Sequence, residues 1–162
     1  MKYVECHDVH WNKRKIPASK LFFRPSVYGV IIERGRVLLS KQWDGYDFPG
    51  GGSEIHETLE DTLKRELWEE TGLRVKPLKV LWTGTSFFSM PFVKKHANCI
   101  LVYYLCKRVG GKLSKKNFDV HEKTYADMPE WVPVRRVPKL KFYNSVDSAA
   151  IVRLAIRGRR AS

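Results

Sequence analysis

The chain has little cysteine and no long apolar segment. Its three cysteines, Cys6, Cys99 and Cys106, are too few to predict a disulfide framework. No apolar run reaches the roughly 18 residues that a membrane-spanning helix needs, and the first residues lack the apolar segment of a signal peptide. We therefore expect a cytoplasmic protein that makes no membrane contact, with Cys99 and Cys106 as reduced core residues. Cys6, His7 and His10 do not predict a zinc site, because no second cluster completes four ligands.

Acidic residues are also scarce outside one segment. The chain has 30 lysines and arginines against 17 acids, a formal net charge of +13. Residues 51–73 contain seven acids and two bases, a net of −5, so the rest of the chain carries +18. An acidic pocket in a basic protein favours a polyanionic ligand at a cation-filled site. RNA is a possible partner for this charge, and a generally basic surface without a specific partner is the alternative.

The order of patterns predicts one mixed domain of helices and strands. With 162 residues, 29% of them charged and 43% hydrophobic, the chain is large enough for one globular core. We expect residues 1–22 to form a basic lead-in, irregular or with a short strand, and residues 23–162 to form a single domain. The expected strands cover residues 23–33, 36–42, 75–87 and 98–109, with a late strand at 131–133, and the expected helices cover residues 58–71 and 145–156.

The helix expected at 58–71 has clear start and stop signals. Thr58 can cap its first turn, with Asp61 three residues later. Leu59, Leu63 and Leu67 follow at four-residue spacing and predict an apolar stripe. Gly72 can adopt the left-handed conformation that ends a helix.

Three glutamates occupy the last turn of this helix, where acids are unfavourable. Glu66, Glu69 and Glu70 face the partial negative charge of unpaired carbonyls and also repel one another. On a helical wheel, Glu66 and Glu70 fall within about 20° of Leu59, so they border the core-facing stripe. A half-buried carboxylate needs a partner or takes up a proton. The three together predict an oxygen-ligand site for Mg²⁺, or Mn²⁺ in its place, rather than a solvated acidic face.

The segment around the helix resembles the Nudix box, G-x5-E-x7-R-E-U-x-E-E-x-G-U, where U is apolar. Reading from Gly51, every fixed position is filled over residues 51–73. The flanks are similar to the family over roughly residues 24–157. The resemblance implies an α/β (α+β) fold, a Nudix-type α/β/α sandwich with a mixed, curved sheet between helices.

The resemblance also implies roles for individual residues. Glu66 and Glu70 would be the principal metal ligands, and Glu69 would bind directly or through water. The backbone carbonyl of Gly50 would be a further ligand. Arg65 would orient the glutamates, and Glu57 would be a supporting acid or a further ligand through water.

The implied reaction is hydrolysis of a nucleoside diphosphate linked to another group. The catalytic set is then Arg65, Glu66, Glu69 and an acid in a later loop that acts as a base or as an additional metal ligand. Glu122 is the candidate for this acid and Asp119 is the reserve. Glu66 is the alternative general base inside the box. Trp43 and Phe88 are candidate contacts for a nucleobase.

One residue departs from the family pattern. His56 stands where glycine often precedes the first glutamate of the box, so it either adopts an unusual backbone conformation or the loop differs locally. We interpret His56 as a loop residue rather than a ligand, because the neighbouring donors are all oxygens.

Several functional alternatives remain open at this point. The basic surface is compatible with an RNA 5′-end pyrophosphohydrolase, a decapping-type activity. A non-catalytic nucleotide- or RNA-binding module is disfavoured because all the box acids are present. An isomerase of the isopentenyl diphosphate type is disfavoured because Cys99 and Cys106 lack the surrounding motif of that chemistry. Many relatives are dimers, so a homodimer is possible.

Overall fold

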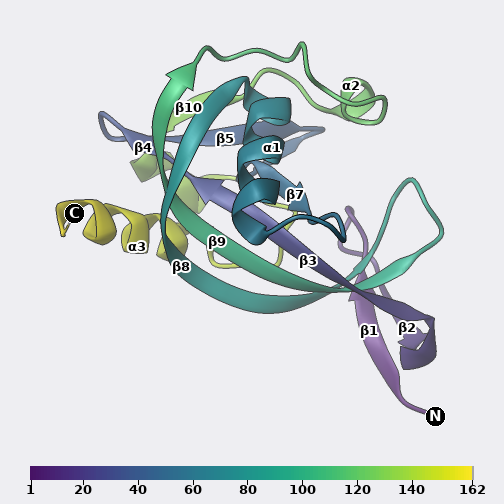
Figure 1. Ribbon diagram of the computed structural model, residues 1–162. Coiled ribbons are helices and arrows are strands. Elements are labelled where there is room, and N and C mark those ends of the chain that lie inside the picture. Colours follow the sequence, from purple (N-terminus) through teal and green to yellow (C-terminus); the bar gives the residue numbers. More distant parts are fainter. Residues whose placement is uncertain (162) are drawn as a thin grey trace.

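The computed structural model describes residues 1–161 and shows a mixed sheet with helices on both faces (Figure 1). The main sheet has six strands in the order β2-β1-β8-β9-β3-β7. These strands are β1 (Tyr3–His7), β2 (Lys13–Pro17), β3 (Leu21–Val30), β7 (Gly50–Gly52), β8 (Leu73–Ser89) and β9 (His96–Gly111). A second sheet has the order β10-β5-β4, with β6 paired to β5. Its strands are β4 (Ile32–Glu33), β5 (Arg36–Gln42), β6 (Gly45–Asp47) and β10 (Glu130–Pro133).

The helices are α1 (Leu59–Thr71), α2 (Glu122–Tyr125) and α3 (Ser148–Arg160), with short 3₁₀ turns η1 (Ala18–Lys20) and η2 (Val134–Lys139). Strands β3 and β9 run parallel, whereas β8–β9 and β3–β7 are antiparallel. The sheet is therefore mixed, as predicted.

Alternation along β3 separates two hydrophobic cores. Val27 packs with Leu63 and Leu67 of α1, whereas Tyr28 and Val30 belong to the core that contains residues of α3. Because successive strand residues point to opposite faces, α1 and α3 cover opposite sides of the sheet. The predicted α/β/α sandwich is confirmed.

Helix α1 begins and ends as the sequence predicts. Thr58 and Asp61 form a reciprocal capping box, and Gly72 ends the helix in the left-handed conformation with φ 74°. No basic residue lies in its last turn. Leu59 differs from the expectation: it is exposed, because it lies in the first turn beyond the edge of the sheet core, whereas Leu63 and Leu67 are fully buried.

The other boundaries shift by a few residues. Strands β8 and β9 extend beyond the expected ranges, and β9 continues through Gly110 and Gly111. Register irregularities interrupt β8 between Arg74 and Val75, Pro77 and Lys79, and Val80 and Trp82. Helix α3 begins three residues later than expected, because the Asp147 side chain accepts a hydrogen bond from the Ala150 N–H and caps it there.

Residues 1–22 contain more regular secondary structure than the irregular segment or short strand expected from the sequence. Strands β1 and β2 form an antiparallel hairpin, and β1 joins β8 through the parallel pair His7–Phe88. Cys6 and His7 are buried, so the end of the hairpin packs into the domain. Within the described part of the chain, no helix is long and apolar enough to cross a membrane.

Candidate metal and catalytic site

The centre of the site is a group of three carboxylates from two segments. Oxygens of Glu66, Glu70 and Glu122 lie within 4.8 Å of one another. Glu66 and Glu70 are one helical turn apart on α1, and Glu122 begins the short helix α2. The structure therefore brings the later-loop acid Glu122 together with two box glutamates.

Glu70 is fixed from the sheet side. The Ser40 hydroxyl donates to Glu70 Oε2 at 2.8 Å, and the Gly50 N–H donates to the same oxygen at 3.1 Å. Gly50 has φ 151°, and a Cβ there would lie 2.0 Å from the Val27 carbonyl oxygen. Only glycine fits this close approach of β7 to β3.

Glu122 is fixed by Asp119. The Asp119 N–H donates to Glu122 Oε2, and the Glu122 N–H donates to Asp119 Oδ1, both at 2.7 Å. This reciprocal pair of hydrogen bonds lets Asp119 orient Glu122. Asp119, the alternative candidate for the later-loop acid, therefore supports Glu122 instead of replacing it.

Burial makes ionisation of the three carboxylates unfavourable. Desolvation raises the pKa of Glu66 to about 7. It also raises the pKa of Glu70 well above its usual value, with the Glu66 charge as the next cause. The pKa of Glu122 is raised by desolvation as well. A divalent cation would relieve both the desolvation and the repulsion, and three hard oxygen donors suit Mg²⁺ or Mn²⁺.

Arg65 lies at the edge of this group and holds three glutamates. Its Nε and Nη2 contact the two Glu57 carboxylate oxygens at 2.6 and 2.9 Å. Its Nη1 contacts Glu66 at 2.9 Å and Glu69 at 3.1 Å. Hydrogen bonds from Arg65 lower the pKa of Glu57 to about 2. The arrangement matches the orienting role expected for Arg65.

Glu57 and Glu69 lie outside the group of three. Both Glu57 oxygens bind Arg65, and one also accepts from the Thr62 hydroxyl. The Glu69 side chain is 34% exposed, against 13% for Glu66. The geometry brings Glu66, Glu70 and Glu122 together and leaves Glu57 and Glu69 as their neighbours through Arg65.

The two aromatic candidates lie in different places. Trp43 stacks on Tyr125 with ring centroids 4.4 Å apart and planes 16° apart, and it also stacks on Phe92. The Trp43 backbone N–H donates to the Tyr125 carbonyl. Trp43 thus holds α2 in place, and 41% of its surface remains exposed. Phe88 packs on His7 beside the N-terminal hairpin.

The structure places His56 in a loop and Cys99 and Cys106 in the core, as expected from the sequence. His56 is exposed in the loop before α1. Among the described residues, the non-glycine positions with positive φ are Trp11, Arg34 and Trp43, so His56 needs no unusual backbone conformation. Cys6, Cys99 and Cys106 are free and buried. Burial raises the pKa of the Cys106 thiol to about 12, which does not favour a nucleophilic role.

Sequence reasoning missed Ser40 and the role of Asp119. Ser40 lies at the end of the buried run Val37–Leu39 in β5 and is itself buried. A polar residue that continues a buried apolar strand needs a partner, which is the signal that could have identified it.

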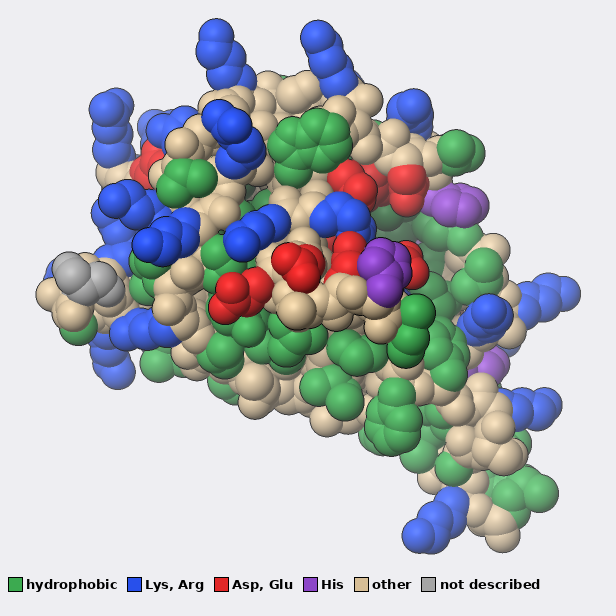
Figure 2. All heavy atoms as spheres, viewed as in Figure 1, with side chains coloured by type: hydrophobic (Ala, Val, Ile, Leu, Met, Phe, Trp, Pro, Cys, Tyr) green, Lys and Arg blue, Asp and Glu red, His purple; other side chains and the backbone are tan. Residues whose placement is uncertain are grey.

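Acidic and basic side chains occupy separate areas of the surface around the site. Figure 2 shows acidic side chains gathered over α1, with Lys and Arg side chains around them. The acidic segment predicted from the sequence thus forms one patch on a basic surface.

A NUDIX domain model matches residues 22–154 of the chain. The chain belongs to the NUDIX domain family. It is therefore classed with the Nudix hydrolases, as the box predicted. An ADP-ribose pyrophosphatase of Methanocaldococcus jannaschii is 29% identical over 80% of this chain and 75% of its own length. An RNA pyrophosphohydrolase of Aeromonas hydrophila subsp. hydrophila is 31% identical over 74% of this chain and 77% of its own length.

One further relative is a longer protein, and a solved structure supports the fold. The chain spans 42% of the MutT4 protein of Mycobacterium tuberculosis, with 32% identity over 73% of this Nudix chain. The crystal structure of an ADP-ribose pyrophosphatase from Streptococcus suis matches with a TM-score of 0.65 and 17% identity, covering 86% of this chain and 93% of that one. At that identity the match shows the Nudix fold alone.

Proposed function

We propose that this Nudix protein hydrolyses a diphosphate bond in a nucleoside diphosphate linked to another group, with Mg²⁺, or Mn²⁺ in its place, as cofactor. The observation that carries the proposal is the group of buried carboxylates Glu66, Glu70 and Glu122. Such a group is stable in ionised form only with a cation. The proposed domain organisation is a basic N-terminal segment over residues 1–22, which contains the β1–β2 hairpin, and a single Nudix hydrolase domain over residues 23–162, in the cytoplasm.

Glu66 and Glu70 are the proposed principal ligands, with the Gly50 carbonyl as a further one. When bound, the cation would neutralise charge on the phosphates and lower the pKa of an attacking water. Arg65 holds Glu66 and Glu69 in place, and Glu69 completes the ligand set directly or through water. Glu57 supports the set through Arg65.

Glu122 is the proposed proton acceptor. Its Oε2 accepts a hydrogen bond from the Asp119 N–H, which fixes the carboxylate beside Glu66 and Glu70. It belongs to a segment separate from α1, so it can accept a proton without being needed as a helix ligand. Trp43 keeps this segment in place, and the exposed part of its ring remains a candidate substrate contact, as does Phe88.

A substrate panel with matched variants tests the proposal. Cleavage with Mg²⁺ should be followed by separating the products. Nucleoside triphosphates and oxidised nucleotides should give a nucleoside monophosphate and pyrophosphate, whereas dinucleoside polyphosphates, nucleotide sugars and ADP-ribose should each give two phosphorylated fragments. Glu66→Gln and Glu70→Gln should lose activity together with affinity for Mn²⁺. Glu122→Gln should lower kcat by about 10²-fold or more with Mn²⁺ affinity retained. Glu60→Gln, an exposed acid on the same helix, is the control. Full turnover in the first two variants would contradict the metal assignment.

A second candidate substrate is the 5′ end of an RNA. The net charge of +18 outside residues 51–73 supports it, as does the name of the Aeromonas hydrophila relative. Several phosphate contacts would make binding strongly salt-dependent. A 5′-triphosphorylated oligonucleotide should then bind more tightly than the matching nucleoside triphosphate at low salt, with the difference lost at high salt. Equal affinity at all salt concentrations removes this candidate.

A further inference from the structure

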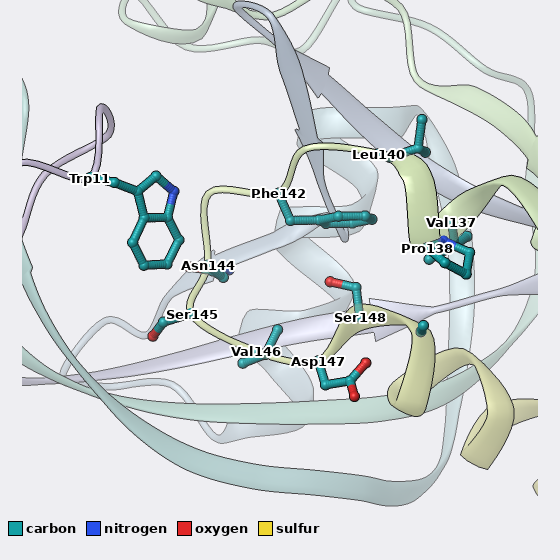
Figure 3. A pocket seen from close by; sticks show the side chains of 11 residues that line it. Trp11, Val137, Pro138, Leu140, Phe142, Asn144, Ser145, Val146, Asp147 and Ser148 are labelled. Atoms are coloured by element: carbon teal, nitrogen blue, oxygen red, sulfur yellow. The ribbon is translucent and has the colours of Figure 1, made fainter.

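A second concave site lies away from the carboxylates, between the N-terminal hairpin and the chain before α3. It is an open pocket of about 590 Å³, within the size range of sites that hold small ligands. Figure 3 shows Trp11, from the turn between β1 and β2, on one side of this space and Phe142 on the other. Trp11 precedes residues 22–154, the part that matches the NUDIX domain model, so this wall is a feature of this chain rather than of the matched domain.

The Trp11 ring is held in place although it is 39% exposed. It stacks on His7 with centroids 4.4 Å apart and planes 8° apart. His7 Nε2 is hydrogen-bonded to the Ser86 hydroxyl at 3.1 Å, and Ser145 donates to that hydroxyl at 3.0 Å. The ring therefore offers a fixed surface, and a ligand that stacks on it loses little free energy in ordering the wall.

Ser148 supplies an independent sign of a ligand. It is 6% exposed, and its hydroxyl has no hydrogen-bond partner among the described residues. It lines the pocket, and Figure 3 shows its oxygen directed toward the space between Trp11 and Phe142. A buried hydroxyl without a partner is unfavourable, so a ligand atom that binds it removes that cost.

The chemistry of the lining residues indicates which part of a nucleotide the pocket would bind. Trp11 and Phe142 offer aromatic surface, and Asp147 is the one charged residue in the described lining, which contains no lysine or arginine. A phosphate is disfavoured in such surroundings, whereas a flat uncharged ring with polar edge atoms is favoured.

We propose that this pocket binds the heterocyclic base of the nucleotide, stacked on Trp11 with an edge atom bound to the Ser148 hydroxyl. The proposal rests on the proposed function only in taking the ligand to be a nucleotide. A short segment connects the two sites. Asp47 accepts a hydrogen bond from the Asn144 N–H beside the pocket, and three residues later Gly50 donates to Glu70. The backbone from Asp47 to Gly50 spans at most about 10 Å, so the Asn144 end of the pocket lies beside the segment that contacts Glu70.

The test is a binding measurement that needs no hydrolysis. Affinities for AMP, GMP, CMP and UMP should be compared with that for ribose 5-phosphate, by calorimetry with a chelator present. The variants are Trp11→Ala, Ser148→Ala and the control Tyr3→Ala, an exposed aromatic on the same hairpin. Thermal unfolding of each variant is recorded in parallel.

We expect the mononucleotides to bind more tightly than ribose 5-phosphate. Trp11→Ala should weaken them by about tenfold and leave ribose 5-phosphate unchanged. Ser148→Ala should weaken at least one mononucleotide without lowering the unfolding temperature, because its hydroxyl has no protein partner to lose. Tyr3→Ala should bind as the unaltered protein does.

The proposal is overturned if ribose 5-phosphate binds as tightly as the mononucleotides, or if Trp11→Ala and Ser148→Ala bind all four as the unaltered protein does. Failure here is distinct from failure of the proposed function. Diphosphate hydrolysis with no effect of Trp11→Ala on binding leaves the function and removes the base pocket. Trp11-dependent binding without hydrolysis of any diphosphate keeps the base pocket and removes the proposed function.

Discussion

Glu57 and Arg65 form a two-pronged ion pair, with Nε 2.6 Å from one carboxylate oxygen and Nη2 2.9 Å from the other. This pair links the entrance of α1 to its last turn, since the same guanidinium also contacts Glu66. A planar fork is needed for this geometry, which lysine does not supply.

Loss of this pair should affect turnover more than metal affinity. Glu57→Gln keeps the shape but removes the charge that holds Arg65, so Glu66 and Glu69 become less well positioned. We expect kcat to fall by about 10²-fold, with affinity for Mn²⁺ little changed. Titration of Mn²⁺ alongside steady-state kinetics checks this. A loss of Mn²⁺ affinity as large as that in Glu66→Gln would show that Glu57 is a ligand instead.

The stack of Trp43 on Tyr125 should be required for Glu122 to act. Helix α2 has only four residues, so its position depends on contacts such as this one. Trp43→Leu should lower kcat toward the level of Glu122→Gln, whereas Trp43→Phe keeps a ring and should retain more activity. A substrate contact at Trp43 would instead raise KM in both variants with kcat preserved.

Divalent cations should stabilise the fold, and more so at higher pH. Desolvation raises the pKa of Glu66 to about 7, so protons compete with the cation below that pH. At a hundredfold excess over Kd the gain is about 2.7 kcal/mol, or about 5–10 °C in Tm. Thermal unfolding with and without Mg²⁺ at pH 6 and pH 8 measures it. Glu70→Gln should abolish the gain and Glu60→Gln should keep it; equal gains in both would contradict the site.

Asp47 should make stability fall as pH rises. Burial raises its pKa to about 7 from 3.8, so the folded state holds the proton more tightly than the unfolded chain does. Its contribution is therefore fully present below pH 4, is lost between about pH 4 and 7, and is constant above. Relative to Asp47→Asn, stability should decline by up to about 1.4 kcal/mol per pH unit in that window. Urea unfolding without metal tests this, and a pH-independent difference would refute it.

Gly51 should be needed for the position of Glu66 rather than for the fold. A Cβ at Gly51 would lie 2.7 Å from the Glu66 carboxyl atoms. The end of a flexible side chain can move, so Gly51→Ala should change the free energy of unfolding by less than about 1 kcal/mol. The moved carboxylate should still lower kcat by about tenfold or more. Unchanged kinetics would mean that Glu66 tolerates displacement.

Sequence signals within the helix itself predicted α1. Contacts between residues far apart in the sequence could not be predicted. The capping box at Thr58 and the stop at Gly72 lie within the helix's own sequence, so the positions of Glu66 and Glu70 followed. Ser40 binds Glu70 from 30 residues away, and His7 binds Ser86 from 79 residues away. Periodicity tells which face a residue occupies but not which distant strand lies beside it. The hairpin over residues 3–17 was missed for the same reason.

The register of β1 also has a consequence for self-association. Because β1 pairs with β8 at one described position, His7–Phe88, most of the 17-residue outer margin of β8 is left without a neighbouring strand. Pro77 and Lys79 fall at one of its register breaks, and proline, lysine and bulges all discourage the docking of a foreign strand. Two copies of this chain are therefore not expected to join their sheets along β8, and a homodimer would use another surface.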